Sequence, residues 1–220
     1  MAVVSAHSGH IWLIACNARD RAIERVKNDP DHSPSDAIVA IILSAAATEA
    51  FINELAEIIA MTRVHLDETL STEVRAFADA IREIEESHGS LQDKYLTAAQ
   101  TLRGSPFDKG TNPFQDFDTL VKLRNDLMHA KPKDGLEIDA NGALSTAVPK
   151  HITALQQRRL ARTPCQGDNI SWFDTLTTEK MATWAPKTAH AIILAVLDLI
   201  PDGPFDPALM FKVVFRNRTP

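Results

Sequence analysis

The residues best suited to chemistry in this sequence lie close together, near the end of a predicted helix. Arg124 and Asn125 are adjacent, and His129 follows four residues after Asn125. Histidine exchanges protons near neutral pH, so it can serve as a general acid or a general base. An arginine guanidinium can bind a phosphate through two parallel hydrogen bonds. These residue types are therefore suited to chemistry on a phosphate ester.

The spacing of these residues also sets a geometric condition. Asn125 and His129 are four residues apart, so they share one face of a helix. Arg124 and His129 are roughly 140° apart on an ideal helix, and they do not share a face. A flexible arginine side chain, a distorted helix end before Pro132, or a second copy of the chain would each bring the two groups together.

Two charged residues occupy apolar helix faces, and we expect them to pair. Arg124 lies within the apolar arc of its helix, and Glu49 lies at the centre of the apolar face of an earlier helix, one turn before Asn53. An unpaired charge in a protein interior is costly, so an ion pair between Glu49 and Arg124 is predicted. Such a pair could also serve only to fix the register of the two helices. The apolar faces consist of Ile38, Ile42, Ala45, Ile52 and Ala56, and of Phe117, Leu120, Val121, Leu127 and Met128.

Helical periodicity dominates the chain and predicts an all-α, antiparallel helical bundle in a single domain over residues 1–220. Ser33-Pro34 is typical of a helix start, because a capping residue precedes a proline at the first helical position. Pro132 sets the latest end of the helix that carries Arg124. The predicted helices span about residues 11–27, 34–63, 69–88, 91–102, 112–131 and 178–199.

A stretch rich in glycine and proline separates the last two of these helices. We interpret residues 134–177 as an insertion, with a β-hairpin over 136–138 and 143–145 around Asn141-Gly142. A short helix is predicted over 152–161. The C-terminal tail, about residues 204–220, contains the apolar run 211–215, which we interpret as a strand or an extended arm.

The stretch Leu120–His129 resembles the R-x4-H motif of HEPN domains (higher eukaryotes and prokaryotes nucleotide-binding). Arg124-Asn125 is followed by three residues and then His129, near a helix end. The earlier segment 44–53 also resembles this family, with Glu49 at its polar position on an early core helix. The resemblance covers roughly residues 34–131 and the final helix, and it implies a helical bundle with the motif on a late helix.

This resemblance implies an activity on RNA. Many members of the family are metal-independent endoribonucleases, often toxins or antiviral effectors, whose active site forms between two protomers. By analogy, His129 would be the acid or base, Arg124 would bind or orient the phosphate, and Asn125 would be an accessory polar residue, with Glu49 and Asn53 in support. Other members are non-catalytic and bind a nucleotide or a protein partner, and the motif alone does not separate the two classes.

The charge of the chain limits how it could meet RNA. The formal net charge is −6, which argues against a general nucleic-acid coat protein. From Leu120 to Lys133, however, Lys122, Arg124, Lys131 and Lys133 face only Asp126, and we expect the three lysines to bind RNA. Two other basic clusters are more typical of solvated surface. They are His151, Arg158, Arg159 and Arg162, and Lys212, Arg216 and Arg218.

The sequence favours a cytoplasmic protein without a metal or cofactor. The chain has two cysteines and no basic residue before Arg19, so a disulfide framework and a signal peptide are not indicated. The apolar runs 37–52 and 189–200 are shorter than the ~20 residues that cross a membrane. His7 and His10 lack further ligands at metal-binding spacing. The predicted partners are RNA and a second copy of the chain, with an antitoxin or regulatory protein as a further candidate.

Overall fold

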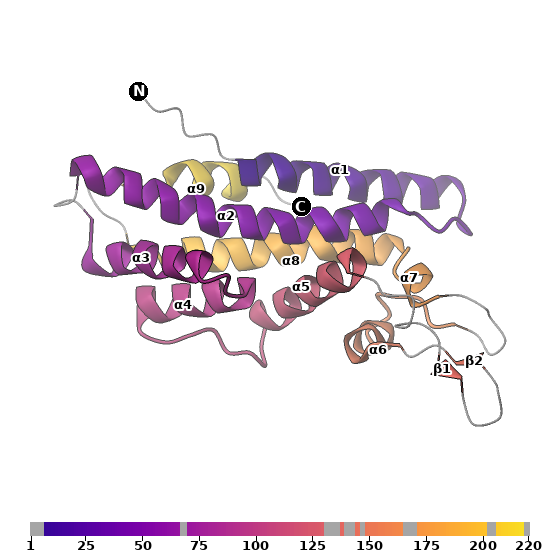
Figure 1. Ribbon diagram of the computed structural model, residues 1–220. Helices are drawn as coiled ribbons and strands as arrows, with labels where there is room; N and C mark the ends of the chain where they lie inside the picture. The colour runs from indigo at the N-terminus through magenta and orange to yellow at the C-terminus, as the bar shows by residue number, and fades with distance from the viewer. Residues whose placement is uncertain are drawn as a thin grey trace.

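The computed structural model describes residues 7–66, 70–129, 137–138, 144–145, 148–164, 171–201 and 206–217. Within these ranges the chain is an all-α bundle, as the sequence predicts (Figure 1). The helices are α1 (His7–Asn28), α2 (Asp36–Leu66), α3 (Thr72–Glu86), α4 (Leu91–Arg103), α5 (Phe114–Met128), α6 (Lys150–Gln157), α7 (Trp172–Thr175), α8 (Glu179–Leu197) and α9 (Leu209–Arg216). Two-residue strands β1 (Glu137–Ile138) and β2 (Leu144–Ser145) lie between α5 and α6.

The long helix α2 forms the centre of the bundle. It contacts α1, α3, α4, α5 and α8, and Figure 1 shows α1 and α9 on one side of it and α3, α4 and α5 on the other. Among the described helices, α1 and α2 pack together most extensively, and both bury several alanines. The buried apolar residues of α2 are Ala37, Ala40, Ile41, Ala45, Ala47, Phe51, Ile52, Leu55, Ala56 and Ile59.

Side-chain caps fix the starts of α3, α4 and α8, and Ser171 caps the short helix α7 in the same way. Ser71, Ser90 and Thr178 precede α3, α4 and α8, and each hydroxyl accepts a hydrogen bond from a backbone N–H of the first turn. Gly104 ends α4 with a φ of 82°, a left-handed conformation that glycine adopts without a Cβ clash. These local signals place α4 directly before the loop that leads into α5.

The prediction of a strand or extended arm at residues 211–215 is wrong, because this segment belongs to helix α9. Phe211 and Phe215 are four residues apart, so they project from one face of the helix, and both are fully buried. The ring of Phe51 on α2 contacts both of them edge-on, and Trp12 on α1 contacts Phe215. The C-terminal tail therefore contributes to the core of the bundle.

The region between α5 and α8 contains only short elements. β1 and β2 pair antiparallel, with Ile138 opposite Leu144, where the sequence predicts a hairpin. The turn Asn141-Gly142 lies outside the described residues. Helix α6 lies where a short helix over 152–161 is predicted, and it packs against α5.

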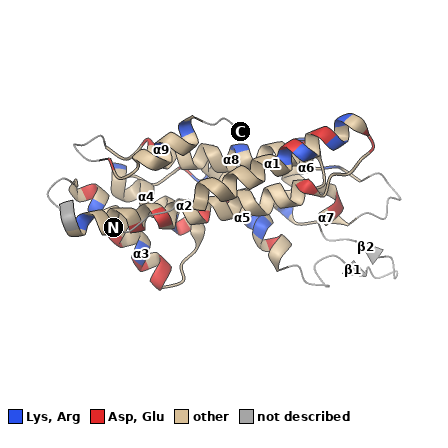
Figure 2. Ribbon diagram, turned by 90° about the horizontal axis from the view of Figure 1, so that it is seen from above, with Lys and Arg blue, Asp and Glu red and all other residues tan. Residues whose placement is uncertain are grey.

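Helix α2 is also long and apolar enough, by length and composition alone, to cross a membrane over Asp36–Val64. Half of its most apolar window is buried inside the bundle. The core helix of a soluble protein has the same properties, so this feature does not indicate a membrane protein. In the view from above, the middle of the bundle is mostly uncharged and charged segments of both signs lie toward its ends (Figure 2).

Candidate functional site

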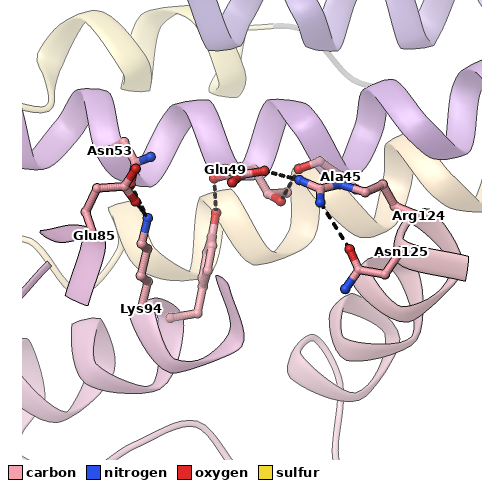
Figure 3. A network of polar contacts seen from close by, with 9 residues as sticks. Ala45, Glu49, Asn53, Glu85, Lys94, Arg124 and Asn125 are labelled. Atoms are coloured by element: carbon pink, nitrogen blue, oxygen red, sulfur yellow. Dashed lines mark hydrogen bonds and ion pairs between the residues drawn. The ribbon is translucent and has the colours of Figure 1, made fainter. Parts of the chain in front are cut away.

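The predicted ion pair between Glu49 and Arg124 is present, and it connects α2 to α5. Arg124 Nη2 donates to Glu49 Oε2 across the helix interface (Figure 3). The side chains are 42% exposed for Glu49 and 25% exposed for Arg124, so the expectation that both are fully buried is wrong. The reason is that burial decreases along α5: Phe117, Leu120 and Val121 are buried, whereas Met128, predicted in the same apolar arc, is 57% exposed.

Asn125 holds the same guanidinium from a second side. Arg124 Nη1 donates to Asn125 Oδ1 at 3.0 Å. The guanidinium therefore has a carboxylate on one terminal nitrogen and an amide oxygen on the other. An arginine has five N–H donors, so donors remain on all three nitrogens for an anionic ligand. This arrangement restricts the orientation of the arginine while leaving it accessible from solvent.

His129 lies directly after α5 and is exposed. Its backbone N–H donates to Asn125 O at 2.9 Å, and its φ of −121° and ψ of 25° depart from helical values. Its imidazole makes no hydrogen bond or ion pair with the described part of the chain, and it does not contact Arg124. The structure therefore brings Glu49, Arg124 and Asn125 together and leaves His129 open at the helix end.

Asn53 does not join the Glu49–Arg124 pair and belongs to a second cluster. Lys94 Nζ donates to Asn53 Oδ1 at 2.8 Å and also forms an ion pair with Glu85 (Figure 3). Lys94 is only 3% exposed, and sequence reasoning missed it. The signal was available, because Lys94 lies three residues after the buried Leu91 on the same face of α4.

A buried tyrosine separates the two clusters. Tyr95 on α4 is fully buried, and its hydroxyl donates to the backbone oxygen of Thr48 at 3.0 Å. Burial raises the pKa of the Tyr95 phenol well above its ordinary value. Tyr95 is therefore a neutral hydrogen-bond donor, and its ring packs on Phe117 of α5 with centroids 4.4 Å apart.

The positive charge expected around the motif is largely neutralised in the described residues. Lys122 Nζ forms an ion pair with Asp118 Oδ2 at 2.6 Å, and Arg124 is paired with Glu49. Both acids lie outside the stretch for which the sequence gives an excess of basic residues. Lys131 and Lys133 lie outside the described residues.

A second histidine lies against the motif helix, and sequence reasoning placed it only in a basic cluster. His151 at the start of α6 has Nε2 2.9 Å from Asp126 Oδ2 on α5. Desolvation by burial lowers the pKa of His151, and Lys122 adds to this effect, while Asp126 and Asp118 oppose it. No sequence pattern connects the two partners, because they lie on separate helices that pack together only in the fold.

Comparison with known proteins gives no support from relatives: no family model, curated protein or solved structure matches this chain. In the described ranges, no group of three or more His, Cys, Asp or Glu residues is placed to hold a metal ion. The side chains of the site supply an oriented guanidinium and, at the end of the same helix, an accessible imidazole.

Proposed function

We propose that this protein is a metal-independent endoribonuclease of the HEPN type that acts as a homodimer. One observation carries the proposal: Arg124 is oriented by Glu49 and Asn125, and the exposed imidazole of His129, which has no partner among the described residues, follows at the end of the same helix. The resemblance of the motif to HEPN domains supports a role as a toxin or antiviral effector, with an antitoxin or regulatory protein as a further partner.

The reaction would be cleavage of RNA by its own 2′-hydroxyl. The 2′-oxygen attacks the adjacent phosphorus and loses its proton to a base, and the 5′-oxygen leaves with a proton from an acid, which yields a 2′,3′-cyclic phosphate. Arg124 would stabilise the charge that develops on the phosphate oxygens through its remaining N–H donors. His129 can perform one of the two proton transfers.

A second copy of the chain would complete the site. Each chain presents one His129 at the end of α5, whereas the reaction requires both an acid and a base. No hydrogen bond joins the side chains of Arg124 and His129 within one chain in the described structure, which also favours a site built from two protomers. The activity is therefore expected to fall when dilution separates the dimer, with the oligomeric state followed by light scattering.

The proposal is tested by RNA cleavage in EDTA with wild-type protein and His129→Ala. We expect the variant to cleave at least about 100-fold more slowly, the lower range for loss of a general acid or base. His10→Ala is the matched control, because His10 is also an exposed histidine on a helix and lies on α1. Equal, background-level cleavage by wild type and His129→Ala would reject the ribonuclease.

The acidic partners of the basic residues favour a second candidate function. Lys122 and Arg124 are each paired with a carboxylate, which lowers the attraction of this face for a polyanion. A non-catalytic module that binds a nucleotide or a protein partner would suit such a surface. It would bind its ligand equally well with alanine at residue 129 and would not cleave RNA.

A further inference from the structure

A basic cavity lies at the end of the bundle where three separate segments meet. The end of α1 with the turn that follows it, the residues after α6 and the start of α8 line an open surface cavity of about 340 Å³. This is within the range of pockets that hold small ligands, roughly 300–1,000 Å³. The polar residues that matter for its chemistry are His32, Arg159, Arg162, Thr178, Glu179 and Lys180.

The cations of this cavity lack acidic partners in the described structure. Arg159 and Lys180 make no hydrogen bond or ion pair through their side chains, and Arg162 Nη2 donates only to the hydroxyl of Ser33 at 3.2 Å. Against these three positive charges, Glu179 is the acidic residue in the lining. Asp29 and Asp31 belong to the neighbouring turn and do not line the cavity.

The adjacent Arg158, in contrast to the arginines of the cavity, is neutralised by an acidic partner. Both of its terminal nitrogens bind the carboxylate of Asp116 on α5, at 2.6 and 3.0 Å. Arg158 does not line the cavity, and its charge serves to attach α6 to α5. Among the described residues, no acidic side chain pairs with Arg159, Arg162 or Lys180, so the cavity is locally basic within a protein of net charge −6.

Hydrogen bonds fix the walls of the cavity. The backbone N–H of Arg162 donates to Thr175 O at 2.8 Å, and the hydroxyl of Thr178 donates to Leu160 O at 2.6 Å. The segment after α6 is thus attached to the start of α8. The first turn of α8 adds the positive end of a helix dipole to the charges of the side chains. The positive side chains and the N-terminus of α8 would both attract a phosphate group.

Helix α6 connects this cavity with the motif helix. His151, near its start, contacts Asp126 on α5, and Arg159 follows shortly after its end. Arg158, directly after α6, contacts Asp116 in the first turn of α5, so α6 runs antiparallel to α5 and the cavity lies toward the start of α5. His129 follows Asp116 by 13 residues, about 20 Å at the rise of an α-helix. A strand of several nucleotides spans this distance.

We propose that this cavity binds backbone phosphates of single-stranded RNA several nucleotides away from the cleavage site. The inference rests on the proposed ribonuclease function for its ligand. Its position rests on the cavity and on three cations that form no ion pair with the described residues. Arg159 and Lys180 bind phosphate oxygens, and Arg162 completes the positive wall. RNA is thus held by a cavity outside the motif, which compensates for the neutralised Lys122.

The test uses a fluorescein-labelled 12-nucleotide RNA and fluorescence anisotropy, with His129→Ala in every protein so that the RNA stays intact. Arg159→Gln with Lys180→Gln is compared with Arg82→Gln with Lys187→Gln. The control pair removes the same charge from exposed residues: Arg82 lies on α3, and Lys187 lies two turns further along α8.

We expect the cavity variant to bind at least tenfold more weakly than the protein with Arg159 and Lys180 intact, and the control variant to bind within twofold of it. The slope of log Kd against log salt concentration should also fall. Each phosphate contact with a single strand contributes about 0.7 to this slope, so the loss of two contacts should lower it by about 1.4. Equal loss in both variants, or no binding of RNA by the protein with an intact cavity, overturns the inference. Thermal melts of both variants confirm that they fold alike.

The cleavage assay separates this inference from the proposed function. Specific loss of RNA affinity in the cavity variant, with cleavage unaffected by His129→Ala, supports the RNA site and rejects the ribonuclease. Cleavage that depends on His129, with binding unaffected in the cavity variant, supports the ribonuclease and rejects the RNA site.

Discussion

Two polar clusters lie along the same stretch of α2, and they differ in how they meet solvent (Figure 3). The outer cluster consists of Glu49, Arg124 and Asn125, and its arginine is 25% exposed. The inner cluster consists of Asn53, Glu85 and Lys94, and its lysine is 3% exposed. Each cluster joins α2 to another helix through one cation.

The difference in exposure indicates different tasks. The ammonium of Lys94 is itself buried and is held by the half-buried Asn53 and by Glu85, which is 59% exposed. The guanidinium of Arg124 keeps donors directed toward solvent and lies on the helix that ends at His129. We therefore interpret the inner cluster as structural and the outer cluster as functional.

The largest effect on folding is expected at the inner cluster. Lys94→Ala removes the buried side chain and leaves Asn53 without its donor, so the free energy of unfolding should fall by about 2–4 kcal/mol. Lys94→Met should stay within about 1 kcal/mol of wild type, because it keeps the packed chain and loses only the charge. Glu85 is 59% exposed and returns to water in both variants. Urea unfolding measures both changes.

The inner cluster should leave catalysis unchanged once the protein is folded. Cleavage of RNA per folded molecule is expected to be the same for Lys94→Met and wild type. A strong loss of cleavage in a stably folded Lys94→Met protein would contradict the division between the two clusters.

The outer cluster should show the opposite pattern. Arg124→Ala breaks a half-exposed ion pair, which stabilises by less than about 1 kcal/mol. Its cleavage of RNA should nevertheless fall at least about 100-fold, as when a donor to a developing anion is removed. Arg63→Ala is the matched control, because it breaks the exposed Arg63–Asp79 pair and leaves the proposed site intact. Parallel urea unfolding and cleavage rates separate the two effects.

An Arg124→Ala protein that unfolds as easily as Lys94→Ala, with normal cleavage, would instead assign a structural role to the outer cluster. In that case the Glu49–Arg124 pair serves to fix helix register, the alternative that the sequence also allowed.

The two clusters also show how far the sequence could be interpreted. Glu49 and Arg124 could be paired from sequence because each charge interrupts an apolar helix face. Lys94 interrupts the face of α4 in the same way, but its long aliphatic stem makes a lysine on such a face easy to assign to the surface. The partial exposure of Arg124 could not be predicted from the sequence. Hydrophobic periodicity shows which face of a helix a side chain lies on, but it does not show how far the neighbouring helices cover that face.

The remaining differences have equally specific causes. The run at 211–215 is short and apolar, so periodicity does not separate a strand from a buried helix. The segment packs against the core through a contact between Phe211 and Phe51, which lies 160 residues earlier in the chain. The sequence pattern around 211–215 contains no information about this contact. The His151–Asp126 contact is likewise a product of packing between α5 and α6, and residue spacing carries no information about it.

A smaller effect is expected from Asn125, which orients the outer cluster through a single hydrogen bond. Asn125→Ala frees one side of the guanidinium while the Glu49 pair remains, so cleavage should fall by about three- to tenfold, the net value of one hydrogen bond at a solvent-exposed site. Stability should not change measurably, because Asn125 is exposed. Asn125→Asp keeps an acceptor at this position and should retain more activity than alanine. A loss as large as that of Arg124→Ala would indicate that Asn125 contacts the RNA itself.

The smallest effect concerns His151, which lies on α6 beside the outer cluster and is 20% exposed. Its pKa is lowered from the ordinary value of 6.5, mainly by burial, so the folded state binds the proton less readily than the unfolded state. The stability contributed by neutral His151 is therefore complete above about pH 6.5 and declines as the pH falls through the folded pKa. His151→Gln removes this titration, and its melting temperature should decline less than that of wild type between pH 7 and pH 5. If the melting temperatures of wild type and His151→Gln change equally with pH, burial does not shift the titration of His151. Solvent would then reach the α5–α6 contact as freely as it reaches Arg124.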